Sequence, residues 1–444
     1  MKKLLKRLCS AMVAAVMVMT MAPAAFAADG GAQFQNGPYL LAPKTNSMVV
    51  VWESTEKVSA TIAYGTDESK LCDPIKVEID ADAPDFKGSK MNLFHYKLDN
   101  LTPGTRYYYE VKLEGGATCK ASFKTLSEKP DQIRLITLSD SHIFATRAEL
   151  DQAIKEFDPD LLLHCGDMVE GTGAQAEQFS FWFQGKVEND YIHSYPVVYS
   201  SGNHDQGGVY FNTYVYSIQD EEYGAEVEGD SSFNYAGLHI ITMNSNPWGL
   251  FQMNSEATGQ KADAATIKTI DNAMNWLKKD LATDAAKNAD FRLIFMHHPV
   301  SDAYTKRYIP AVIEPGKVDL LLSGHTHSYA RAVSSNPAVG AGTIYLTHQD
   351  ARTYNKKGDF FYITSTPGSG VLDVKNYGAT AAGQESKVAN ETLVAKDKQQ
   401  LSWSDISITP STVLYNGEVT VTAKVTNNGK GLAAAVIPVV DNGT

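Results

Sequence analysis

Five short polar clusters, each directly after a hydrophobic run, constrain the possible fold of this chain more than any other feature of its sequence. In chain order they are Asp140-Ser141-His142, Gly166-Asp167, Gly202-Asn203-His204-Asp205, His297-His298-Pro299 and Gly324-His325-Thr326-His327. The carboxyl ends of strands in an open α/β sheet converge on one crevice, where side chains from distant positions can meet. We therefore expect a single site built from all five clusters.

The residue types in these clusters suit a pair of metal ions. Two divalent metals about 3.5–4 Å apart can clamp the attacking and leaving oxygens of a phosphoryl displacement. Neutral imidazoles and hard oxygen ligands fit first-row metals, and one carboxylate must be able to bridge the pair. A lone Asp-x-His or Gly-Asp is more often structural. All five clusters in this order predict a catalytic metal site.

The segments around the clusters indicate an α/β domain. Hydrophobic runs that read as buried strands lie at 133–139, 161–165, 197–199, 238–243, 293–296 and 320–322. Apolar positions at helical spacing occur between them, as in residues 272–281. Residues 34–127 differ, because β-branched and aromatic runs alternate there with turns such as Leu101-Thr102-Pro103-Gly104-Thr105. That pattern predicts a β-sandwich in front of the α/β domain.

The first residues predict secretion. A basic start containing Lys2 and Arg7 precedes an apolar stretch, and Ala25-Phe26-Ala27 is a small-x-small cleavage site. Residues 1–28 therefore read as a signal peptide, with an uncleaved membrane anchor as the alternative. The remaining expected units are a sandwich at 34–127, a catalytic domain at 131–375, a linker at 376–402 and the start of a truncated immunoglobulin-like domain at 403–444. Because about 100 residues make such a domain, we expect the chain to be part of a longer protein.

The net charge and the cysteine content bear on which partners the protein can bind and in which compartment it could form a disulfide. Signal removal takes away four cations, so the formal net charge goes from −12 to −16. An acidic surface repels phosphate backbones, which disfavours nucleic-acid binding. No later apolar run is long enough to span a bilayer. Cys72 and Cys119 could pair in an oxidising compartment, and the sequence leaves that pairing open.

The clusters resemble the signature of calcineurin-like metallophosphoesterases, namely Asp-x-His, Gly-Asp, Gly-Asn-His-Asp/Glu, His and Gly-His-x-His. The likeness is strongest to purple acid phosphatases, which also carry a fibronectin type III-like module before the catalytic domain. Ser232-Phe233-Asn234-Tyr235-Ala236-Gly237 and the stretch after Gly324 are similar too. This resemblance implies a four-layer αββα domain with the site at one edge of two packed sheets.

The resemblance also implies a role for each cluster residue. The ligands of the first metal would be Asp140, His142, Asp167 and His327. The ligands of the second would be Asp167, Asn203, His297 and His325, with Asp167 bridging. His204 would face the scissile phosphate, stabilising the transition state or protonating the leaving group, and Asp205 would orient it.

Two positions depart from purple acid phosphatases. In that group a tyrosinate follows Gly-Asp-x-x and binds ferric iron, and the first motif is Asp-x-Gly. Here Glu170 stands at the tyrosine position and His142 at the glycine position. A histidine ligand is gained where a tyrosine ligand is lost, so we expect two divalent ions, of Mn, Fe or Zn, in place of the purple centre.

The sequence thus predicts a secreted, acid-phosphatase-like phosphomonoesterase that acts by in-line attack of metal-bound hydroxide on a small phosphorylated substrate. One alternative is a nucleotidase or phosphodiesterase of the same superfamily, and another is a non-catalytic, surface-displayed binding protein. The loops at 170–187, 246–263 and 301–309 would select the substrate. Attachment to the cell surface through domains beyond Thr444 is a further expectation.

Overall fold

The protein is represented by a computed structural model. It describes residues 31–80, 85–86, 89–142, 154–171, 176–183, 191–205, 210–249, 263–301, 303–313, 317–333, 343–349, 359–378, 390–395, 401–409 and 420–427.

The N-terminal module is built from antiparallel strands. These are β1 (Phe34–Leu41), β2 (Met48–Ser54), β3 (Ala60–Gly65), β4 (Ile75–Val77), β5 (Asp85–Phe86), β6 (Ser89–Lys90), β7 (Leu93–Leu98), β8 (Arg106–Leu113) and β9 (Thr118–Lys124). One sheet has the order β1-β2-β7 and a second has the order β4-β3-β8-β9. Trp52 stacks on Phe94 between them, with 5.3 Å between ring centroids, in a core that also contains Tyr109 and Phe123. The expected all-β region is therefore confirmed.

Two six-stranded sheets form the centre of the catalytic part. The first has the order β12-β11-β10-β19-β20-β21 and the second β13-β14-β15-β16-β18-β17. Strands of the first are β10 (Ile133–Leu138), β11 (Leu161–His164), β12 (Val197–Tyr199), β19 (Asp359–Ser365), β20 (Val371–Gly378) and β21 (Glu391–Val394). Strands of the second are β13 (Ser231–Tyr235), β14 (Leu238–Thr242), β15 (Phe291–Phe295), β16 (Leu320–Ser323), β17 (Ala330–Val333) and β18 (Ile344–Thr347).

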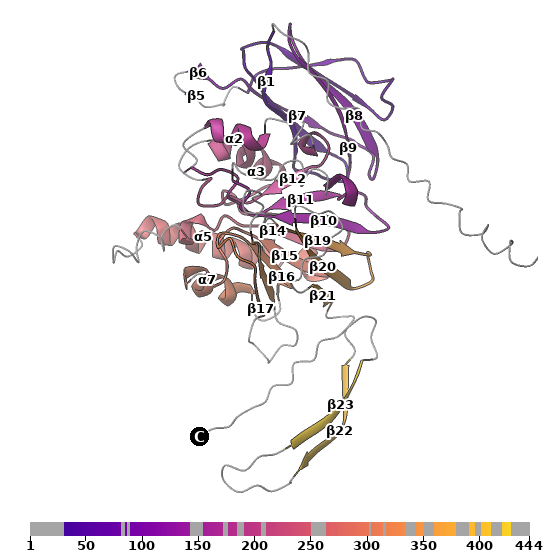
Figure 1. Ribbon diagram of the computed structural model, residues 1–444, viewed down its shortest axis with the longest axis vertical. Helices are drawn as coiled ribbons and strands as arrows, with labels where there is room; N and C mark the ends of the chain where they lie inside the picture. The colour runs from indigo at the N-terminus through magenta and orange to yellow at the C-terminus, as the bar shows by residue number, and fades with distance from the viewer. Residues whose placement is uncertain are drawn as a thin grey trace, which may run out of the picture.

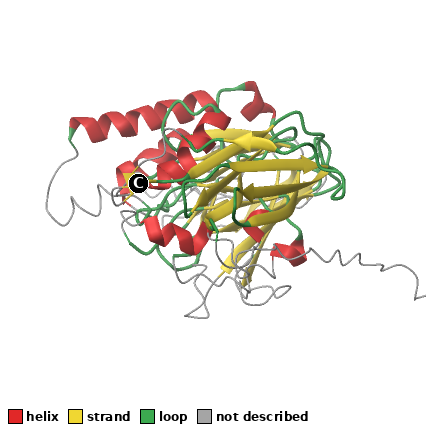
Figure 2. Cartoon of the chain, turned by 90° about the horizontal axis from the view of Figure 1, so that it is seen from above, coloured by secondary structure: helices red, strands yellow, loops and turns green. Residues whose placement is uncertain are grey.

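Alternation along the strands explains how these sheets pack. On β15, Leu293 belongs to the core between the two sheets, whereas Ile294 belongs to the core beneath the helices. Successive side chains point to opposite faces of a strand, so a continuously apolar strand is covered on both sides. The predicted mixed α/β domain is confirmed, and Figures 1 and 2 show its sheets with helices alongside.

Helices and the module cover the outer faces. The helices are α2 (Ala176–Phe183), the π-helix η2 (Asn212–Tyr216), α3 (Ser217–Tyr223), α5 (Ala264–Asp280), α6 (Asp284–Asn288) and α7 (Ala303–Ile313). Helix α5 begins at its cap Asp263, whose carboxylate accepts from the Thr266 N–H, and it packs Ile270 and Leu277 on the second sheet. Tyr39 and Val51 of the module share a core with η2 and the first sheet. No described helix is long and apolar enough to cross a membrane.

The segment expected to be a linker, residues 376–402, contains sheet structure. Strand β20 continues to Gly378, and β21 pairs antiparallel with it as the edge strand of the first sheet. Leu393 is buried in the core between the sheets, which explains why this polar stretch returns to the domain. Beyond it, β22 (Leu401–Thr409) and β23 (Thr420–Asn427) pair as a hairpin (Figure 1).

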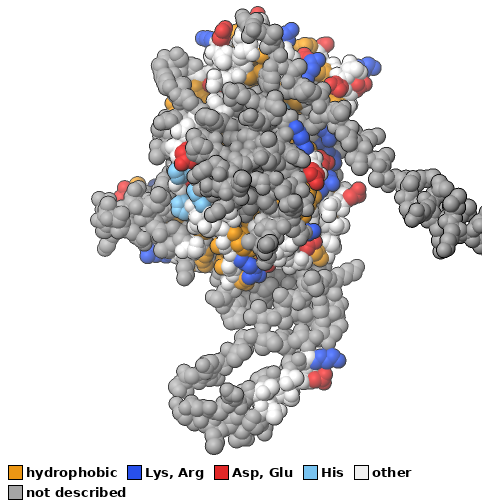
Figure 3. Space-filling view, viewed as in Figure 1, with side chains coloured by type: hydrophobic (Ala, Val, Ile, Leu, Met, Phe, Trp, Pro, Cys, Tyr) orange, Lys and Arg blue, Asp and Glu red, His pale blue; other side chains and the backbone are white. Residues whose placement is uncertain are grey.

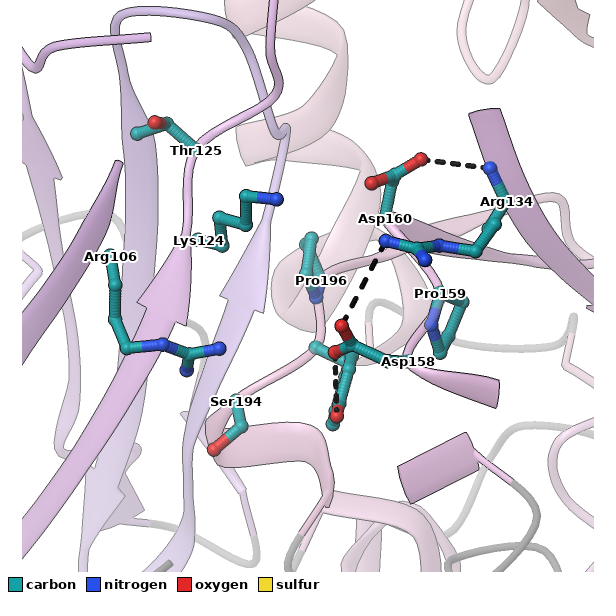
Figure 4. Close-up of a pocket in the computed structure, with 10 residues that line it drawn as sticks. Arg106, Lys124, Thr125, Arg134, Asp158, Pro159, Asp160, Ser194 and Pro196 are labelled. Atoms are coloured by element: carbon teal, nitrogen blue, oxygen red, sulfur yellow. Dashed lines mark hydrogen bonds and ion pairs between the residues drawn. The ribbon is translucent and has the colours of Figure 1, made fainter. Parts of the chain in front are cut away.

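A small pocket, partly open to solvent, lies where the module meets the catalytic part (Figure 4). Arg106 and Lys124, directly paired across β8 and β9, line it together with Asp158 and Asp160. Asp160 Oδ2 accepts from the Arg134 N–H at 2.8 Å, at the start of β10. The charges of the two parts are complementary here. This pocket is at the opposite end of β10 from Asp140.

Candidate metal centre

All five clusters follow strands of the two sheets at the same end. Asp140 and His142 come after β10, Asp167 after β11, and Asn203 soon after β12. In the second sheet the residues that follow are His297 after β15 and then His325 and His327 after β16. Strands β10, β11 and β12 run parallel, as do β15 and β16, which explains why their ends meet. Figure 3 shows histidine side chains together on one face of the molecule.

Two groups of ligand atoms converge there. One contains Asp140, His142, Asp167 and His327, and its ligand atoms lie within 4.8 Å of one another. The other contains Asp167, His297 and His325 with the same spacing. Asn203 completes the second group, because its Oδ1 lies 3.1 Å from His297 Nε2 and 2.8 Å from His325 Nδ1. The structure thus brings together every residue expected to bind metal, and Asp167 is shared.

Backbone carbonyls fix the tautomers of two of these histidines. His142 Nδ1 lies 3.0 Å from the Val169 carbonyl and His297 Nδ1 lies 2.9 Å from the Cys165 carbonyl. A carbonyl can only accept, so each Nδ1 carries a proton and each Nε2 faces the other candidate ligands. His297 Nε2 lies 3.1 Å from Asp167 Oδ2, and His142 Nε2 lies 3.3 Å from His327 Nε2. Metal-binding histidines are commonly held in this way. The donor set, of imidazole and carboxylate, fits divalent first-row ions.

Strained backbone marks the same residues. Five non-glycine residues of the clusters adopt a positive φ, namely Asp140 (54°), His142 (45°), Asp167 (57°), His325 (74°) and His327 (51°). Positive φ is uncommon in non-glycine residues and costs of order 1–3 kcal/mol each, so it persists only where surrounding contacts enforce it. Its concentration at the candidate ligands indicates that function determines this geometry.

Close packing requires glycine at two cluster positions. A Cβ on Gly202 would lie 2.1 Å from Asp167 Oδ1, and one on Gly324 would lie 2.2 Å from Asp140 Oδ2. Both distances are far below van der Waals contact. A side chain at either position would therefore displace a candidate ligand.

Asp205 differs from its expected role. Its carboxylate accepts four backbone N–H groups, from Asp167 and Gly202 at 2.8 Å each, Met168 at 2.8 Å and Val169 at 3.3 Å. Among the described contacts, none joins this carboxylate to His204. Asp205 instead joins the Gly-Asp loop to the Gly-Asn-His-Asp loop.

Glu170 takes the orienting role through its backbone. The His204 Nδ1 lies 2.5 Å from the Glu170 carbonyl oxygen, so Nδ1–H donates and Nε2 is left for a ligand. The His204 N–H also donates to Asp167 Oδ1 at 2.8 Å. Sequence reasoning missed this contact, because any residue type can supply a carbonyl.

Burial keeps several imidazoles neutral. It lowers the pKa of His325 to about 4, with a smaller effect from His297. It lowers the pKa of His142 as well, against the attraction of Asp167 and Asp140. For His297, burial opposes protonation, but Asp167 and Asp140 outweigh it and raise the pKa to about 9. Metal binding there would release a proton.

The histidines outside the expected ligand set have separate structural partners. His164 accepts from the Gly166 N–H at Nδ1, so its Nε2–H donates to Ser141 Oγ at 3.0 Å and links the first two clusters. His298 bonds Ser245 through Nδ1 at 2.8 Å, and its ring packs 4.5 Å from that of His325. The others have contacts remote from the ligands: His239 with Asn234 and Asp280, His348 with Thr137, His193 with Pro38, and His95 with Asp80.

Comparison with known proteins gives matches to two domain families and likenesses to solved structures. Residues 133–329 match the calcineurin-like phosphoesterase family, and residues 38–125 match the purple acid phosphatase N-terminal domain. The solved structure of PhoD is 13% identical with a TM-score of 0.54, covering 82% of this chain and 90% of that chain. A predicted phosphoesterase from Streptococcus pneumoniae TIGR4 is 10% identical with a TM-score of 0.29, over 59% and 98% of the two chains. Zinc-complexed Vps29 from Entamoeba histolytica is 10% identical with a TM-score of 0.29, over 60% and 100%. No curated protein matches the chain.

Proposed function

The chain carries a calcineurin-like phosphoesterase domain preceded by a purple acid phosphatase N-terminal domain, and on that premise we propose that it is a secreted phosphomonoesterase with two divalent metal ions. The observation that carries the two-ion part of the proposal is the position of Asp167. Its carboxylate belongs to both groups of ligand atoms, so one side chain can serve two ions. Bound there, divalent ions would neutralise charge on the phosphoryl oxygens and lower the pKa of water.

His204 is the residue we propose to act on the substrate. Its ring is held at Nδ1 by the Glu170 carbonyl and packs edge-on to His142, with 5.0 Å between ring centroids. In the imidazolium form of the ring, Nε2–H can donate to a phosphoryl oxygen or give its proton to the leaving oxygen. The residue is only partly buried, as a group that meets a substrate must be.

A nucleotidase or phosphodiesterase is the second candidate. Of the aromatic residues that could stack on a base, Trp248 is fully buried, which removes it as a stacking surface. The side chains of Tyr304 and Phe251 lie outside the described residues, as does most of the loop after Gly171. A substrate panel therefore decides between these classes. It should contain p-nitrophenyl phosphate, bis(p-nitrophenyl) phosphate and nucleoside monophosphates, each assayed with Mn²⁺, Zn²⁺ or Fe²⁺.

Asp167→Asn is the variant that tests the two-ion centre. A neutral amide cannot bridge two cations, so we expect elemental analysis to show loss of metal together with loss of turnover. Asp319→Asn is the control, because Asp319 is also a largely buried carboxylate, paired to Arg292 at 2.8 Å on the second sheet. Two full metal equivalents and normal turnover in Asp167→Asn would disprove the proposal, as would the absence of hydrolysis across the panel.

Secretion is proposed from residues 1–28, which lie outside the described residues. Expression of the whole chain in a bacterial host should release protein whose first residue is Ala28 or Asp29. Recovery of the intact chain from the membrane fraction would instead favour the uncleaved anchor.

A further inference from the structure

The N-terminal module and the loop that carries Asn203 and His204 are attached to the same short helical segment. This segment consists of η2 and α3, residues 212–223. Figure 1 shows α3 between the module and the first sheet. The module has no group among the candidate ligands, so any influence on the site must pass through such contacts.

On the module side, the segment is held by a buried carboxylate. Glu53 Oε2 accepts from the Tyr214 hydroxyl at 2.9 Å and from Asn36 Nδ2 at 2.6 Å. The Tyr39 hydroxyl donates to the Tyr214 carbonyl at 2.7 Å. All four residues are buried, and a buried carboxylate is tolerated only when donors such as these surround it. Tyr214 is therefore fixed to the module through both its side chain and its backbone.

The far end of the segment is also held by the module. Glu222 Oε2 lies 3.1 Å from Lys44 Nζ and 2.9 Å from Lys97 Nζ. Lys44 Nζ also donates to the Glu222 carbonyl at 2.5 Å. Contacts near both ends set the position and the direction of the segment relative to the module.

On the catalytic side, the same segment holds the start of the loop that carries Asn203 and His204, which we call the metal loop. The Ser201 N–H donates to the Tyr216 hydroxyl at 2.7 Å, two residues before Asn203. Gln219 pairs with both backbone groups of Tyr199, at 3.0 Å from its N–H and 2.9 Å from its carbonyl oxygen. Gln219 thus takes the place of a neighbouring strand at the end of β12.

The positions of the two tyrosines make the segment a rigid connection. Residues two apart on a helix do not share a face, so Tyr214 can reach the module while Tyr216 reaches the loop. A Cβ on Gly229 would lie 2.5 Å from the Tyr216 ring, which shows how closely that ring is enclosed. The π-helical turn that carries both is a rare conformation, found often at functional sites.

We propose that the N-terminal module positions the metal loop, with Glu53 and Tyr216 as positioning residues at the two ends of this connection. The module is then more than a separate structural unit, because its buried carboxylate determines where Asn203 and His204 lie. The effect on turnover rests on the proposed function, whereas the effect on the loop does not.

Tyr216→Phe tests the catalytic end. The change removes one hydroxyl and leaves the ring in place. In metal-free protein we expect amide exchange in the peptide containing Ser201 to become about 2- to 10-fold faster, as for loss of one buried hydrogen bond. Metal affinity should fall about 10-fold, the smaller end of the range for residues that support ligands. Tyr107→Phe is the matched control, because the Tyr107 hydroxyl likewise accepts a backbone N–H, that of Thr102 at 2.9 Å, within the module.

Glu53→Leu and Glu53→Gln test the module end. Leucine leaves the donors of Asn36 and Tyr214 without an acceptor, so exchange at Ser201 should accelerate and metal affinity should fall. Glutamine keeps an oxygen that accepts from both donors, so it should restore wild-type exchange even if the leucine variant folds poorly. In the Tyr216→Phe background, Glu53→Leu should cause little further change at Ser201, because the hydrogen bond that joins the segment to Ser201 is already absent.

The outcomes separate this inference from the proposed function. Faster exchange at Ser201 in Tyr216→Phe and Glu53→Leu but not in Tyr107→Phe supports the connection, even if no phosphate ester is hydrolysed. If both variants only lower the melting temperature, with exchange and metal affinity as in Tyr107→Phe, the module does not position the loop and the inference is overturned. Additive effects of the two changes at Ser201 would also overturn it.

Discussion

Asp205 Oδ2 accepts the backbone N–H of Asp167 at 2.8 Å, so the two aspartates, 38 positions apart, act as parts of one turn. The same carboxylate also accepts hydrogen bonds from the backbone N–H groups of Met168, Val169 and Gly202. Asp167 has a positive φ of 57°, and these bonds are what hold its backbone there. Asp205 thus positions a candidate bridging ligand and is not itself a member of either group of candidate ligand atoms.

Asp205→Asn should weaken metal binding. The amide nitrogen cannot accept, so one pair of N–H groups loses its partner while the side-chain volume stays the same. We expect metal affinity to fall about 10- to 100-fold, as for other residues that support ligands, and turnover to recover largely at saturating metal. Metal titration followed by turnover checks this. Full metal content with persistently low turnover would instead support the role first expected for Asp205, that of orienting His204.

His204→Ala should keep both metals. Its Nδ1 is bonded to the Glu170 carbonyl, and its ring is not part of either group of ligand atoms. Loss of one positioned acid typically costs about 10²–10⁴ in rate. The loss should be smaller for nitrophenyl phosphate, whose leaving group needs little protonation. Release of metal from this variant would show that His204 is a ligand.

The sequence was informative where side-chain chemistry decides the structure. Asp140, Asp167 and His297 could be predicted because few residue types bind metal and each follows a hydrophobic strand. Alternating strands and helices predicted the mixed α/β fold, and β-branched and aromatic runs separated by turns predicted the all-β module.

The sequence was less informative where backbone groups, or pairings between residues far apart in the chain, decide the structure. The Glu170 carbonyl that orients His204 has no residue-type signal. Strand β21 lies in a polar stretch, and only its pairing with β20 and the burial of Leu393 give it a place in the sheet. The hydrogen bond from Tyr214 to Glu53 joins residues 161 positions apart, and an isolated glutamate on a strand predicts no such partner.

Iron-supplemented protein should be colourless or pale. In purple acid phosphatases the colour comes from a tyrosinate on ferric iron, and here the corresponding residue is Glu170. Its Oε2 lies 3.1 Å from His142 Nδ1 and its side chain is 42% exposed, beside the ligands and not among them. Imidazole stabilises a trivalent ion much less than tyrosinate does, so we expect divalent ions. An intense visible absorption band after expression with iron would show that a tyrosine reaches the metal.

Thiol labelling should distinguish the exposed cysteine from the two buried ones. Cys72 and Cys119 are both free in the structure; Cys72 is exposed and Cys119 is buried. Burial raises the pKa of the Cys119 thiol to about 12 and raises that of Cys165 as well, so neither forms the reactive thiolate at neutral pH. Of the three cysteines that the structure describes, an alkylating reagent at pH 8 should modify only Cys72 in native protein, as read by peptide mass spectrometry. A disulfide-linked peptide containing Cys72 and Cys119 would contradict this arrangement.

The stability of the Glu53→Gln variant should increase relative to that of the wild type as the pH rises. Burial raises the pKa of Glu53 from its ordinary value of 4.5, and the hydrogen bonds from Tyr214 and Asn36 only partly oppose this. The folded state therefore binds this proton more tightly than the unfolded state does. Stability from this group is fully present below about pH 4.5 and is lost as the pH rises through the higher folded pKa. Glutamine keeps the acceptor oxygen and carries no charge, so this loss should disappear.

The measurement is the melting temperature of both proteins in EDTA from pH 4 to pH 8. The melting temperature of the variant relative to that of the wild type should rise with pH and then become constant. Glu56→Gln, at an exposed position after β2, is the control and should show no such trend. A difference between Glu53→Gln and wild type that stays constant with pH would mean that Glu53 titrates alike in the folded and unfolded chain.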